Sequence, residues 1–356
     1  MDFKQTLEKL KKEVDAELQE YLSQAIKDVE RQDKEAGRML RHVAKIIMSG
    51  GKRIRPILMY MGYVAAGGKD KKKIVKASVG IELIHNFFLV HDDIMDHGQT
   101  RHGVETVHNL YEKNSTTIFP DCEESSHFGN SMAIMAGDLL EVLGNQAILR
   151  SGFDSKLKTK AISELQLTIA NTIVGQVQDV CIENKKQTSE KEVLAMYKNK
   201  TAKYTIENPL KIGAILAGAD AKFLEKISLS ALPIGLAFQL QDDILGLFGV
   251  SEKIGKNSGA DIKEGKKTLL VIKAFDKAEI EDVKFMKKML GNAKITRLEI
   301  EKFKSIIEKT GALKYNQNLA AKFIQKGKIE IEKIRINKVA KDFLLGLADY
   351  IIKRSI

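Results

Sequence analysis

The stretch IELIHNFFLV at residues 81–90 is apolar almost all the way round a helix, and it runs directly into HDDIMD at residues 91–96. A helix that is apolar on every side has to be enclosed by other helices. Residues 231–248 have the same character. The two stretches therefore predict central helices of an all-α fold, and we expect a bundle of about ten or more helices.

Helical periodicity extends over most of the chain. Leu7, Leu10, Val14, Leu18 and Leu22 recur at the three- and four-residue steps of one helix face. Similar patterns occur at residues 71–95, 131–150, 157–182, 190–218, 222–248, 280–291, 296–311 and 318–353. No linker or shift of composition divides the chain, which favours one domain over residues 1–356.

Two stretches lack an apolar stripe. Residues 112–130 contain Pro, Gly, Ser and acidic residues between strong helical patterns, and we expect a surface loop there. Residues 249–268 are rich in Gly and Lys. Because long loops inside compact domains are often functional, the second stretch is a candidate for part of the site.

Composition excludes several classes of protein. The 356 residues are 44% hydrophobic with only four prolines, so the chain is neither disordered nor of low complexity. The two cysteines, Cys122 and Cys181, form neither a disulfide scaffold nor a CxxC pair, which indicates a reduced cytoplasmic compartment. The N-terminus is charged throughout, and no uncharged apolar run approaches the roughly 18 residues of a membrane span, so we expect no signal peptide and no integral membrane segment.

A formal net charge of +11 suits nucleic acid, an acidic membrane surface or a phosphorylated substrate. The sequence has no zinc-finger or helix-turn-helix pattern, and its basic residues are not interleaved with aromatic ones. We therefore expect no nucleic-acid partner.

The two acidic clusters are the sharpest chemical signal. Asp92, Asp93 and Asp96 directly follow one apolar helix, and Asp242 and Asp243 interrupt another. Acidic pairs at helix ends are often only solvated surface groups. Two clusters that each follow several apolar residues instead indicate carboxylates neutralised by cations, and Mg²⁺ is the natural candidate because it binds through few carboxylates and completes its shell with water and phosphate oxygens.

Basic segments accompany these clusters. In SGGKRIRP, at residues 49–56, a glycine pair allows close backbone approach, and Lys52 and Arg55 could both reach one diphosphate. Arg101 lies five residues beyond Asp96, next to His102. An ordinary basic loop is the alternative for each segment, and neither a Walker loop nor a strand–GxGxxG–helix unit is present.

With these motifs in this order, the chain resembles the trans-isoprenyl diphosphate synthases of the polyprenyl synthetase family. The resemblance is greatest to archaeal-type short-chain members that make farnesyl or geranylgeranyl diphosphate. The motifs that carry it are GGKRIRP at 50–56, HDDIMD at 91–96, GQTRHG at 98–103, AGD at 136–138, GQVQD at 175–179, KT at 200–201, FQLQDDILG at 238–246 and GKNSGADIKEGKKT at 255–268.

The resemblance implies an enzyme that condenses isopentenyl diphosphate with an allylic diphosphate (dimethylallyl, geranyl or farnesyl) in the presence of Mg²⁺. It implies that Asp92, Asp93, Asp96, Asp242 and Asp243 form the metal-binding group, in which Asp92, Asp96 and Asp242 hold the ions. It also implies that the allylic diphosphate is bound by Arg101, Lys200, Lys256 and Lys266. The isopentenyl diphosphate would rest on Gly51, Lys52, Arg55, His85 and His102, and Thr201 and Gln239 would face the carbocation. It also implies a central apolar cavity within the helical bundle, and a homodimer.

Two departures from the family pattern bear on these roles. His102 stands where most relatives have a second Arg, and Gly246 stands where many have a third acid.

Phe87 and Phe88 lie about one turn before Asp92, where bulky rings would block a growing hydrocarbon tail. We therefore predict a product of fifteen to twenty carbons, although both rings could also be ordinary core residues.

Three other functions compete with this prediction. A terpene cyclase of the same architecture would share the first acidic cluster but has a differently spaced second motif. A non-catalytic partner subunit would have lost a cluster, and both are present here. A nucleic-acid-binding protein would show salt-dependent retention on DNA without turnover.

Overall fold

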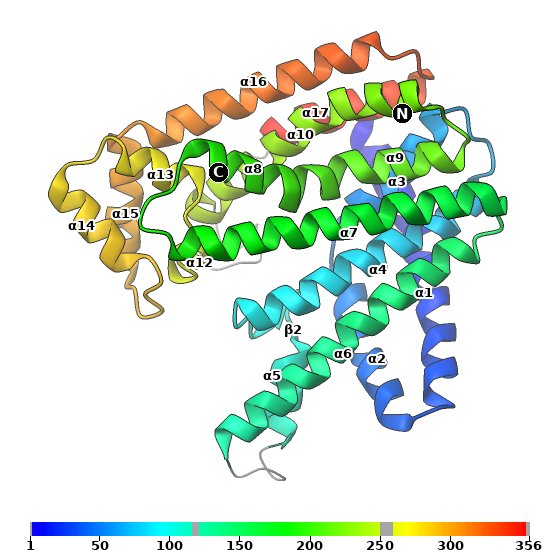
Figure 1. Ribbon diagram of the computed structural model, residues 1–356, viewed down its shortest axis with the longest axis horizontal. Helices are drawn as coiled ribbons and strands as arrows, with labels where there is room; N and C mark the ends of the chain where they lie inside the picture. Colours follow the sequence, from blue (N-terminus) through cyan, green and yellow to red (C-terminus); the bar gives the residue numbers. More distant parts are fainter. Residues whose placement is uncertain (1, 116–120, 250–258, 354–356) are drawn as a thin grey trace. The chain divides into compact units, whose positions relative to one another are not determined.

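Helices make up almost all of the regular structure in the computed structural model, which describes residues 2–115, 121–249 and 259–353. The prediction of an all-α fold is confirmed (Figure 1). The elements in chain order are α1 Phe3–Glu30, α2 Lys34–Met48, α3 Ile54–Ala65, α4 Lys71–Met95, β1 Thr100–Arg101, β2 Val104–Glu105, α5 Val107–Ser115, α6 Cys122–Leu149, α7 Ser155–Asn184, α8 Glu190–Tyr197, the π-helix η1 Lys198–Glu207, α9 Asn208–Leu216, α10 Ala221–Phe248, α12 Ala260–Lys263, α13 Leu269–Phe275, α14 Ile280–Met289, α15 Arg297–Lys309, α16 Ala312–Lys333 and α17 Lys338–Lys353.

The chain folds into two compact units. Unit 1 comprises Met1–Ile162 and Ile212–Gly218, and unit 2 comprises Ser163–Lys211 and Ala219–Ile356. The single domain expected over residues 1–356 stays a prediction.

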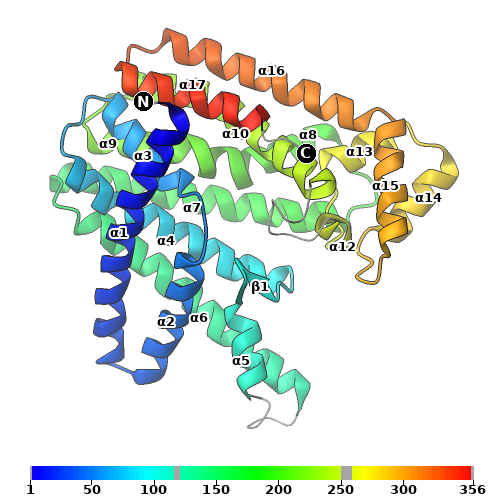
Figure 2. The same ribbon diagram turned by 180° about the vertical axis from the view of Figure 1, so that it is seen from behind.

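In unit 1, the central apolar helix α4 runs beside α6 in both views (Figures 1 and 2). A Cβ at Gly144 would lie 2.9 Å from the carbonyl oxygen of Gly80 and 2.9 Å from Cδ1 of Ile84. Only glycines allow the two backbones to come this close. The close approach buries almost every side chain in the middle of α4, as the sequence predicted.

In unit 2, α10 runs beside α16 (Figures 1 and 2). The C-terminal end of α10 packs into an apolar core with α12, α13 and α15, where Phe303 and Leu270 are fully buried. The core fixes the part of α10 that follows its acidic pair.

The expected surface loop at residues 112–130 is wrong for most of its length. Helix α5 continues to Ser115 and α6 begins at Cys122. The side chain of Asp121 accepts a hydrogen bond of 2.8 Å from the backbone N–H of Glu123, and acidic residues in the first turn favour a helix N-terminus. The acidic residues that suggested a loop therefore start a helix.

Two further boundaries differ from the prediction. The expected helix at 318–353 is divided into α16 and α17, and α13 arises inside a stretch for which no helix was predicted. Residues 259–268 of the expected Gly/Lys loop contain the one-turn helix α12, and residues 250–258 lie outside the described part of the chain.

Helices α4, α6 and α10 are long and apolar enough to span a membrane, judged by length and composition alone. Each of these helices has an 18-residue apolar window with no more than two charged residues, whereas the sequence prediction considered only uncharged runs. In α4, 72% of that window is buried inside the protein, so its apolar side chains form core contacts. The absence of an integral membrane segment stays a prediction.

Candidate active site

The first acidic cluster lies at the C-terminal end of α4. Asp96 is the residue that caps this helix, and its backbone N–H donates to the carbonyl of Asp92 at 2.8 Å. The side chains of Asp92 and Asp96 are one turn apart, and both residues are partly exposed. Solvent therefore reaches both of these residues.

Asp93 differs from its two neighbours because it is 5% exposed and bound by Arg101. Nη2 of Arg101 donates to Oδ1 at 2.6 Å, and Nε donates to Oδ2 at 2.9 Å. Burial raises the pKa of Asp93, and the hydrogen bonds and charge of Arg101 oppose that rise. The structure thus pairs two residues for which the sequence predicted separate roles, on a metal and on a diphosphate.

Arg101 reaches Asp93 from a hairpin. Strands β1 and β2 pair Arg101 with Val104, and His102 and Gly103 form the turn with φ angles of 52° and 77°. Two successive positive φ angles belong to a type I′ turn, which suits a two-residue hairpin. The sequence reading missed this hairpin, although the His-Gly pair was a usable signal for it.

The basic loop between α2 and α3 meets this hairpin. A Cβ added to Gly50 would lie 2.5 Å from the His102 ring, and Gly51 has a φ of +100°. Lys52 is exposed and Arg55 is partly buried at the start of α3. Glycine at position 50 lets the loop backbone pass close to the His102 ring, and glycine at position 51 allows the positive φ.

His85 lies within the influence of the same cations. Its pKa is held well below the ordinary value, first by burial and then by the charges of Arg55, Arg101, Arg53 and His102. His85 is therefore neutral near pH 7. The residues that sequence reasoning assigned to isopentenyl diphosphate come together in unit 1, and they are Gly51, Lys52, Arg55, His85 and His102.

The second acidic pair, on α10 in unit 2, repeats the arrangement of the first. Asp243 is 5% exposed and accepts hydrogen bonds from the Tyr197 hydroxyl and, at 2.7 Å, from Nε2 of Gln239. Burial is the main cause that raises its pKa well above the ordinary range. Asp242 is partly exposed. In each cluster the second acid of the pair faces inward to protein donors, and the first is more exposed.

Gly246, where many relatives have a third acid, is covered by another carboxylate. A Cβ at Gly246 would lie 3.2 Å from Cγ of Asp261, which belongs to α12. The charge of Asp261 also contributes to the raised pKa of Asp243. An acid from a later segment thus lies next to the second cluster, which the sequence reading did not anticipate.

Lys200 and Thr201 lie on η1. Nζ of Lys200 is 2.5 Å from Oδ2 of Asp179, in the GQVQD motif of α7. The hydroxyl of Thr201 donates to Oε1 of Gln239 at 2.6 Å, and Gln239 in turn donates to Asp243. This chain of hydrogen bonds fixes the orientation of the Gln239 amide. π-Helical turns often occur at functional sites, and no sequence signal predicted this one.

The remaining predicted site residues are Lys256, Lys266, Phe87 and Phe88. Nζ of Lys266 is 2.5 Å from Glu264, and Lys256 lies outside the described residues. The rings of Phe87 and Phe88 are in contact, with centroids 4.6 Å apart. Phe87 is 8% exposed and Phe88 is partly exposed, so Phe87 belongs to the core more fully than Phe88 does.

The acidic residues of each unit are of the kind that binds a divalent metal together with phosphate oxygens. Among residues 2–115, 121–249 and 259–353, no three side chains of His, Cys, Asp or Glu form a ready-made metal site. Mg²⁺ is usually bound by one or two carboxylates, and water and substrate phosphates provide the other ligands. In unit 1, the partly exposed Asp92 and Asp96 are donors of that kind, and in unit 2 the partly exposed Asp242 is another.

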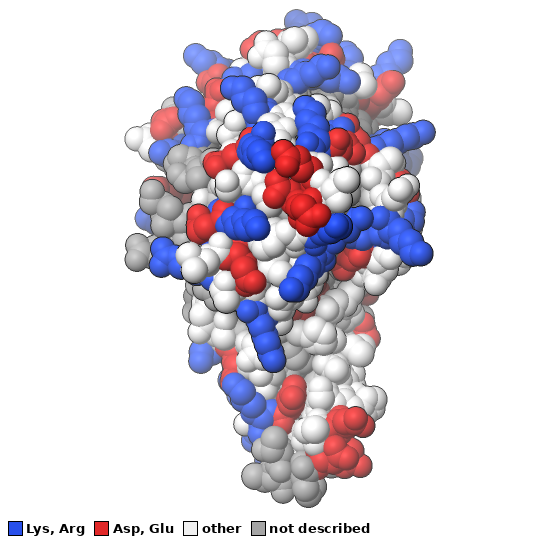
Figure 3. Space-filling view, turned by 90° about the vertical axis from the view of Figure 1, so that its left-hand side faces the viewer, with Lys and Arg blue, Asp and Glu red and all other residues white. Residues whose placement is uncertain are grey.

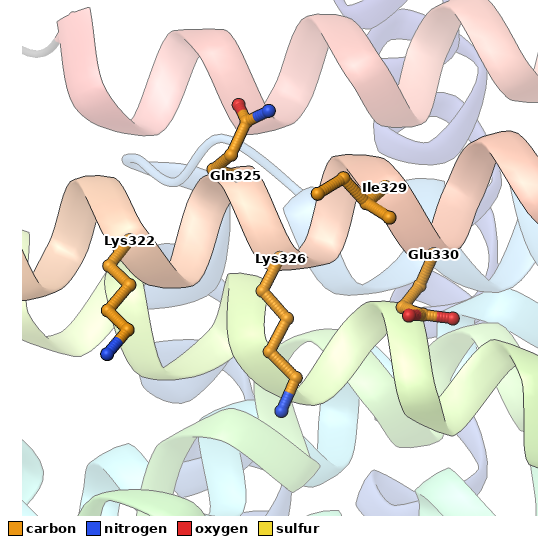
Figure 4. Close-up of a pocket in the computed structure, with 5 residues that line it drawn as sticks. All are labelled: Lys322, Gln325, Lys326, Ile329 and Glu330. Carbon is orange, nitrogen blue, oxygen red and sulfur yellow. The ribbon is translucent and has the colours of Figure 1, made fainter.

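Two other features of the surface are the distribution of charge on one face and a pocket along α16. On the face in Figure 3, Lys and Arg side chains are intermingled with Asp and Glu, so the positive excess does not form a single patch there. A shallow pocket of about 370 Å³ lies along α16, where Lys322 and Lys326 extend to the same side of the helix (Figure 4). It contains none of the predicted site residues.

Comparison with known proteins identifies relatives that cover most of the chain. The sequence model of the polyprenyl synthetase family matches residues 37–309. A geranylgeranyl diphosphate synthase of Saccharolobus solfataricus is 34% identical over 312 residues, which cover 87% of this chain and 88% of the relative. A geranylgeranyl diphosphate synthase of Methanosarcina mazei is 33% identical over 87% of each chain.

Solved structures show the same similarity. A geranylgeranyl pyrophosphate synthase of Corynebacterium glutamicum, complexed with isoprenyl diphosphate and magnesium, is 28% identical and superposes with a TM-score of 0.91 over 100% of both chains. A polyprenyl synthase of Caulobacter crescentus, complexed with calcium and isoprenyl diphosphate, is 25% identical with a TM-score of 0.78 over 98% of both chains. Both of these relatives thus bind a divalent metal together with an isoprenyl diphosphate.

Proposed function

The chain belongs to the polyprenyl synthetase family, and we propose from this premise that it condenses isopentenyl diphosphate with an allylic diphosphate to make a short-chain all-trans prenyl diphosphate. The observation that carries the proposal is the end of α4, where Asp92 and Asp96 are partly exposed next to an Arg101 that Asp93 holds in place. At this end of α4, carboxylates that can bind a metal lie next to a cation that is held in place. A leaving diphosphate needs positive charge of this kind to stabilise it.

In the proposed reaction, the allylic diphosphate leaves first, and the charge on this leaving group has to be stabilised. Mg²⁺, when bound, would neutralise the charge that builds up on that group, and Asp92, Asp96 and Asp242 are the residues that we propose hold it. Arg101 adds a fixed positive charge in unit 1. In unit 2, Lys200 adds another, whose ammonium group is oriented by Asp179. Charges held in place before the reaction need no reorganisation as the bond breaks.

The allylic cation then needs dipoles that do not react with it. The oxygen of Gln239 accepts from Thr201, and its amide nitrogen donates to Asp243, so the side chain cannot rotate freely. We propose that the oxygens of Thr201 and Gln239 face the cation. Their hydrogen-bonded amide and hydroxyl groups are polar enough to stabilise positive charge and are poor nucleophiles.

The attacking isopentenyl diphosphate would bind in unit 1. Gly51, Lys52 and Arg55 of the basic loop would contact its diphosphate, with His102 beside them. His85 is neutral near pH 7 because its pKa is well below the ordinary value, so we propose that it binds as a hydrogen-bonding group and not as a cation.

Product size is the finer part of the proposal. Replacement of Phe87 and Phe88 together by Ala should lengthen the product beyond twenty carbons, because both rings lie about one turn before Asp92. Chromatography of the dephosphorylated products would measure the length. Because Phe87 is more deeply buried, Phe88→Ala alone should cause most of the change. An unchanged product from the double variant would show that neither ring limits elongation.

We also propose a homodimer in the cytoplasm. Four apolar side chains recur along the outer face of α6, and each is about half exposed: Ile134, Met135, Val142 and Leu149. Exposed apolar side chains that share one helix face are typical of a protein interface, although here the exposed Asp138 lies among them. Both cysteines are free, as expected in a reducing compartment. Sedimentation should give twice the 39.8 kDa of one chain.

The direct test of the proposed function is incubation of the purified protein with isopentenyl diphosphate and each of dimethylallyl, geranyl and farnesyl diphosphate. We expect fifteen- or twenty-carbon diphosphates when magnesium is present and none when a chelator removes it. If an allylic diphosphate alone gave a hydrocarbon, the protein would be a terpene cyclase, and the proposal would be wrong.

A further inference from the structure

Arg53 is a buried arginine with a strained backbone. It lies in the basic loop just before α3, its φ is 53°, and it is only 4% exposed. The left-handed region disfavours residues other than glycine. A cation in such a position needs strong compensating contacts, because burial of an unpaired charge is costly.

Three protein groups provide those contacts. Nε of Arg53 donates to Oδ1 of Asp15 on α1 at 2.7 Å, Nη1 donates to Oε1 of Glu82 on α4 at 2.8 Å, and Nη2 donates to the carbonyl of Ile47 at the end of α2 at 2.6 Å. All three guanidinium nitrogens are therefore engaged within unit 1. Arg53 is not placed to bind a diphosphate itself.

Burial by itself would lower the pKa of Arg53, but the charge of Glu82 and the contacts with Asp15 raise it above the ordinary value. The guanidinium thus stays charged, and its two carboxylate partners come from helices far apart in the sequence. Glu82 is buried, whereas the side chain of Asp15 is 24% exposed.

The guanidinium also supports the backbone of the loop. A Cβ added to Gly51 would lie 2.7 Å from Nη1 of Arg53 and 3.9 Å from Oε1 of Glu82. The loop backbone at Gly51 therefore packs directly on the ion pair. Because Lys52 lies between Gly51 and Arg53, a shift of the guanidinium would displace the segment that holds Gly51, Lys52 and Arg55.

We propose that Arg53 is a positioning residue, which α1 holds through Asp15, and that this contact sets the affinity for isopentenyl diphosphate by fixing the basic loop. The inference rests on the proposed function. Helix α1 ends at Glu30, before the start of the family match at residue 37, so the contact gives this N-terminal helix a role in substrate binding.

The test removes the more exposed partner, because Arg53→Ala would leave Glu82 buried and unpaired. Asp15→Ala should raise KM for isopentenyl diphosphate about fivefold, the size expected for loss of a charged contact that is partly exposed. We expect kcat and KM for the allylic diphosphate to stay within about twofold. Asp15→Asn keeps an acceptor oxygen and should raise KM less.

Lys11→Ala is the matched control. Lys11 binds the other carboxylate oxygen of Asp15 at 2.6 Å, so its loss leaves the contact between Asp15 and Arg53 intact. This variant should keep the wild-type KM. Hydrogen–deuterium exchange of a peptide covering residues 47–57 provides a readout independent of activity, and Asp15→Ala should increase its rate about tenfold.

Unchanged exchange and unchanged KM in Asp15→Ala would overturn the inference. Faster exchange with unchanged KM would overturn its link to substrate affinity. If the wild-type protein formed no product, the proposed function would fail on its own, and the exchange comparison would still decide whether Asp15 holds the loop.

Discussion

Asp92→Ala should lower kcat on the order of 10³-fold at saturating substrates and magnesium, the largest loss that we expect from any single substitution. Asp92 is partly exposed and one turn from Asp96, whereas Asp93 is buried and bound by Arg101. Among the three acids at the end of α4, loss of Asp92 would leave Asp96 as the partly exposed one that we propose holds the metal.

Asp93→Asn is the informative comparison for this prediction. Asp93 is buried and occupied by Arg101, so an uncharged amide of the same shape should loosen Arg101 without removing a metal ligand. We expect about a tenfold loss and no change in the magnesium concentration that gives half-maximal rate. Asp92→Ala should shift that concentration upwards.

The control for both variants is Asp28→Ala. Asp28 is an exposed acid on α1 that accepts from Gln24 and Arg31, so its loss changes the charge by the same amount at a distance from the cluster in sequence. Activity of Asp92→Ala within tenfold of wild type would exclude Asp92 from the metal-binding group. Equal magnesium dependence in Asp92→Ala and Asp93→Asn would show that the two acids do not differ in role.

The acidic clusters could be located from sequence because carboxylates are unusual within such apolar helices. Which acid of each pair turns inward could not be read from it. Adjacent helix residues differ by about 100° in direction, so one of the pair was bound to be more buried. The donors that receive the inner acids, Arg101 and Tyr197, lie on a hairpin and on α8, and only the folded chain brings them to Asp93 and Asp243.

The contacts of Arg53 could likewise not be predicted from the sequence. Arg53 lies within GGKRIRP between Lys52 and Arg55, and the sequence predicted no separate role for it. Its partners Asp15 and Glu82 are 38 and 29 residues away and carry no motif of their own. Contacts of this kind arise from the packing of α1 against α4, which helical periodicity predicts as two helices and not as a pair.

Gly175→Ala should lower kcat about 100-fold although it changes no residue with a proposed chemical role. Gly175, in α7, faces the backbone of η1, and a Cβ there would lie 2.6 Å from Cα of Lys200 and 2.8 Å from the carbonyl carbon of Asn199. Backbone atoms cannot rotate away as a flexible side chain can. Helix η1 therefore has to move, and a displacement of about 1 Å at a catalytic group can cost about 10² in rate.

Close packing of α10 against η1 at Gly235 limits the movement of η1. A Cβ at Gly235 in α10 would lie only 2.6 Å from Cα of Ala202, so α10 already contacts the π-helix closely. Displacement of η1 would also carry Thr201 away from Gln239, whose hydrogen bond of 2.6 Å would lengthen. The loss should therefore appear in kcat more than in KM for isopentenyl diphosphate, which we propose binds in unit 1.

The predicted change in Tm of Gly175→Ala is opposite in sign to the usual effect of this substitution. Gly→Ala within a helix normally stabilises by about 0.5–1 kcal/mol, so overlap with η1 has to reverse that gain and lower Tm. Ala170→Gly, at an exposed position of the same helix, should lower Tm through helix propensity alone and keep the wild-type kcat. A Gly175→Ala protein with raised Tm and full activity would show that η1 tolerates the methyl group, and that the glycine is not what positions Lys200 and Thr201.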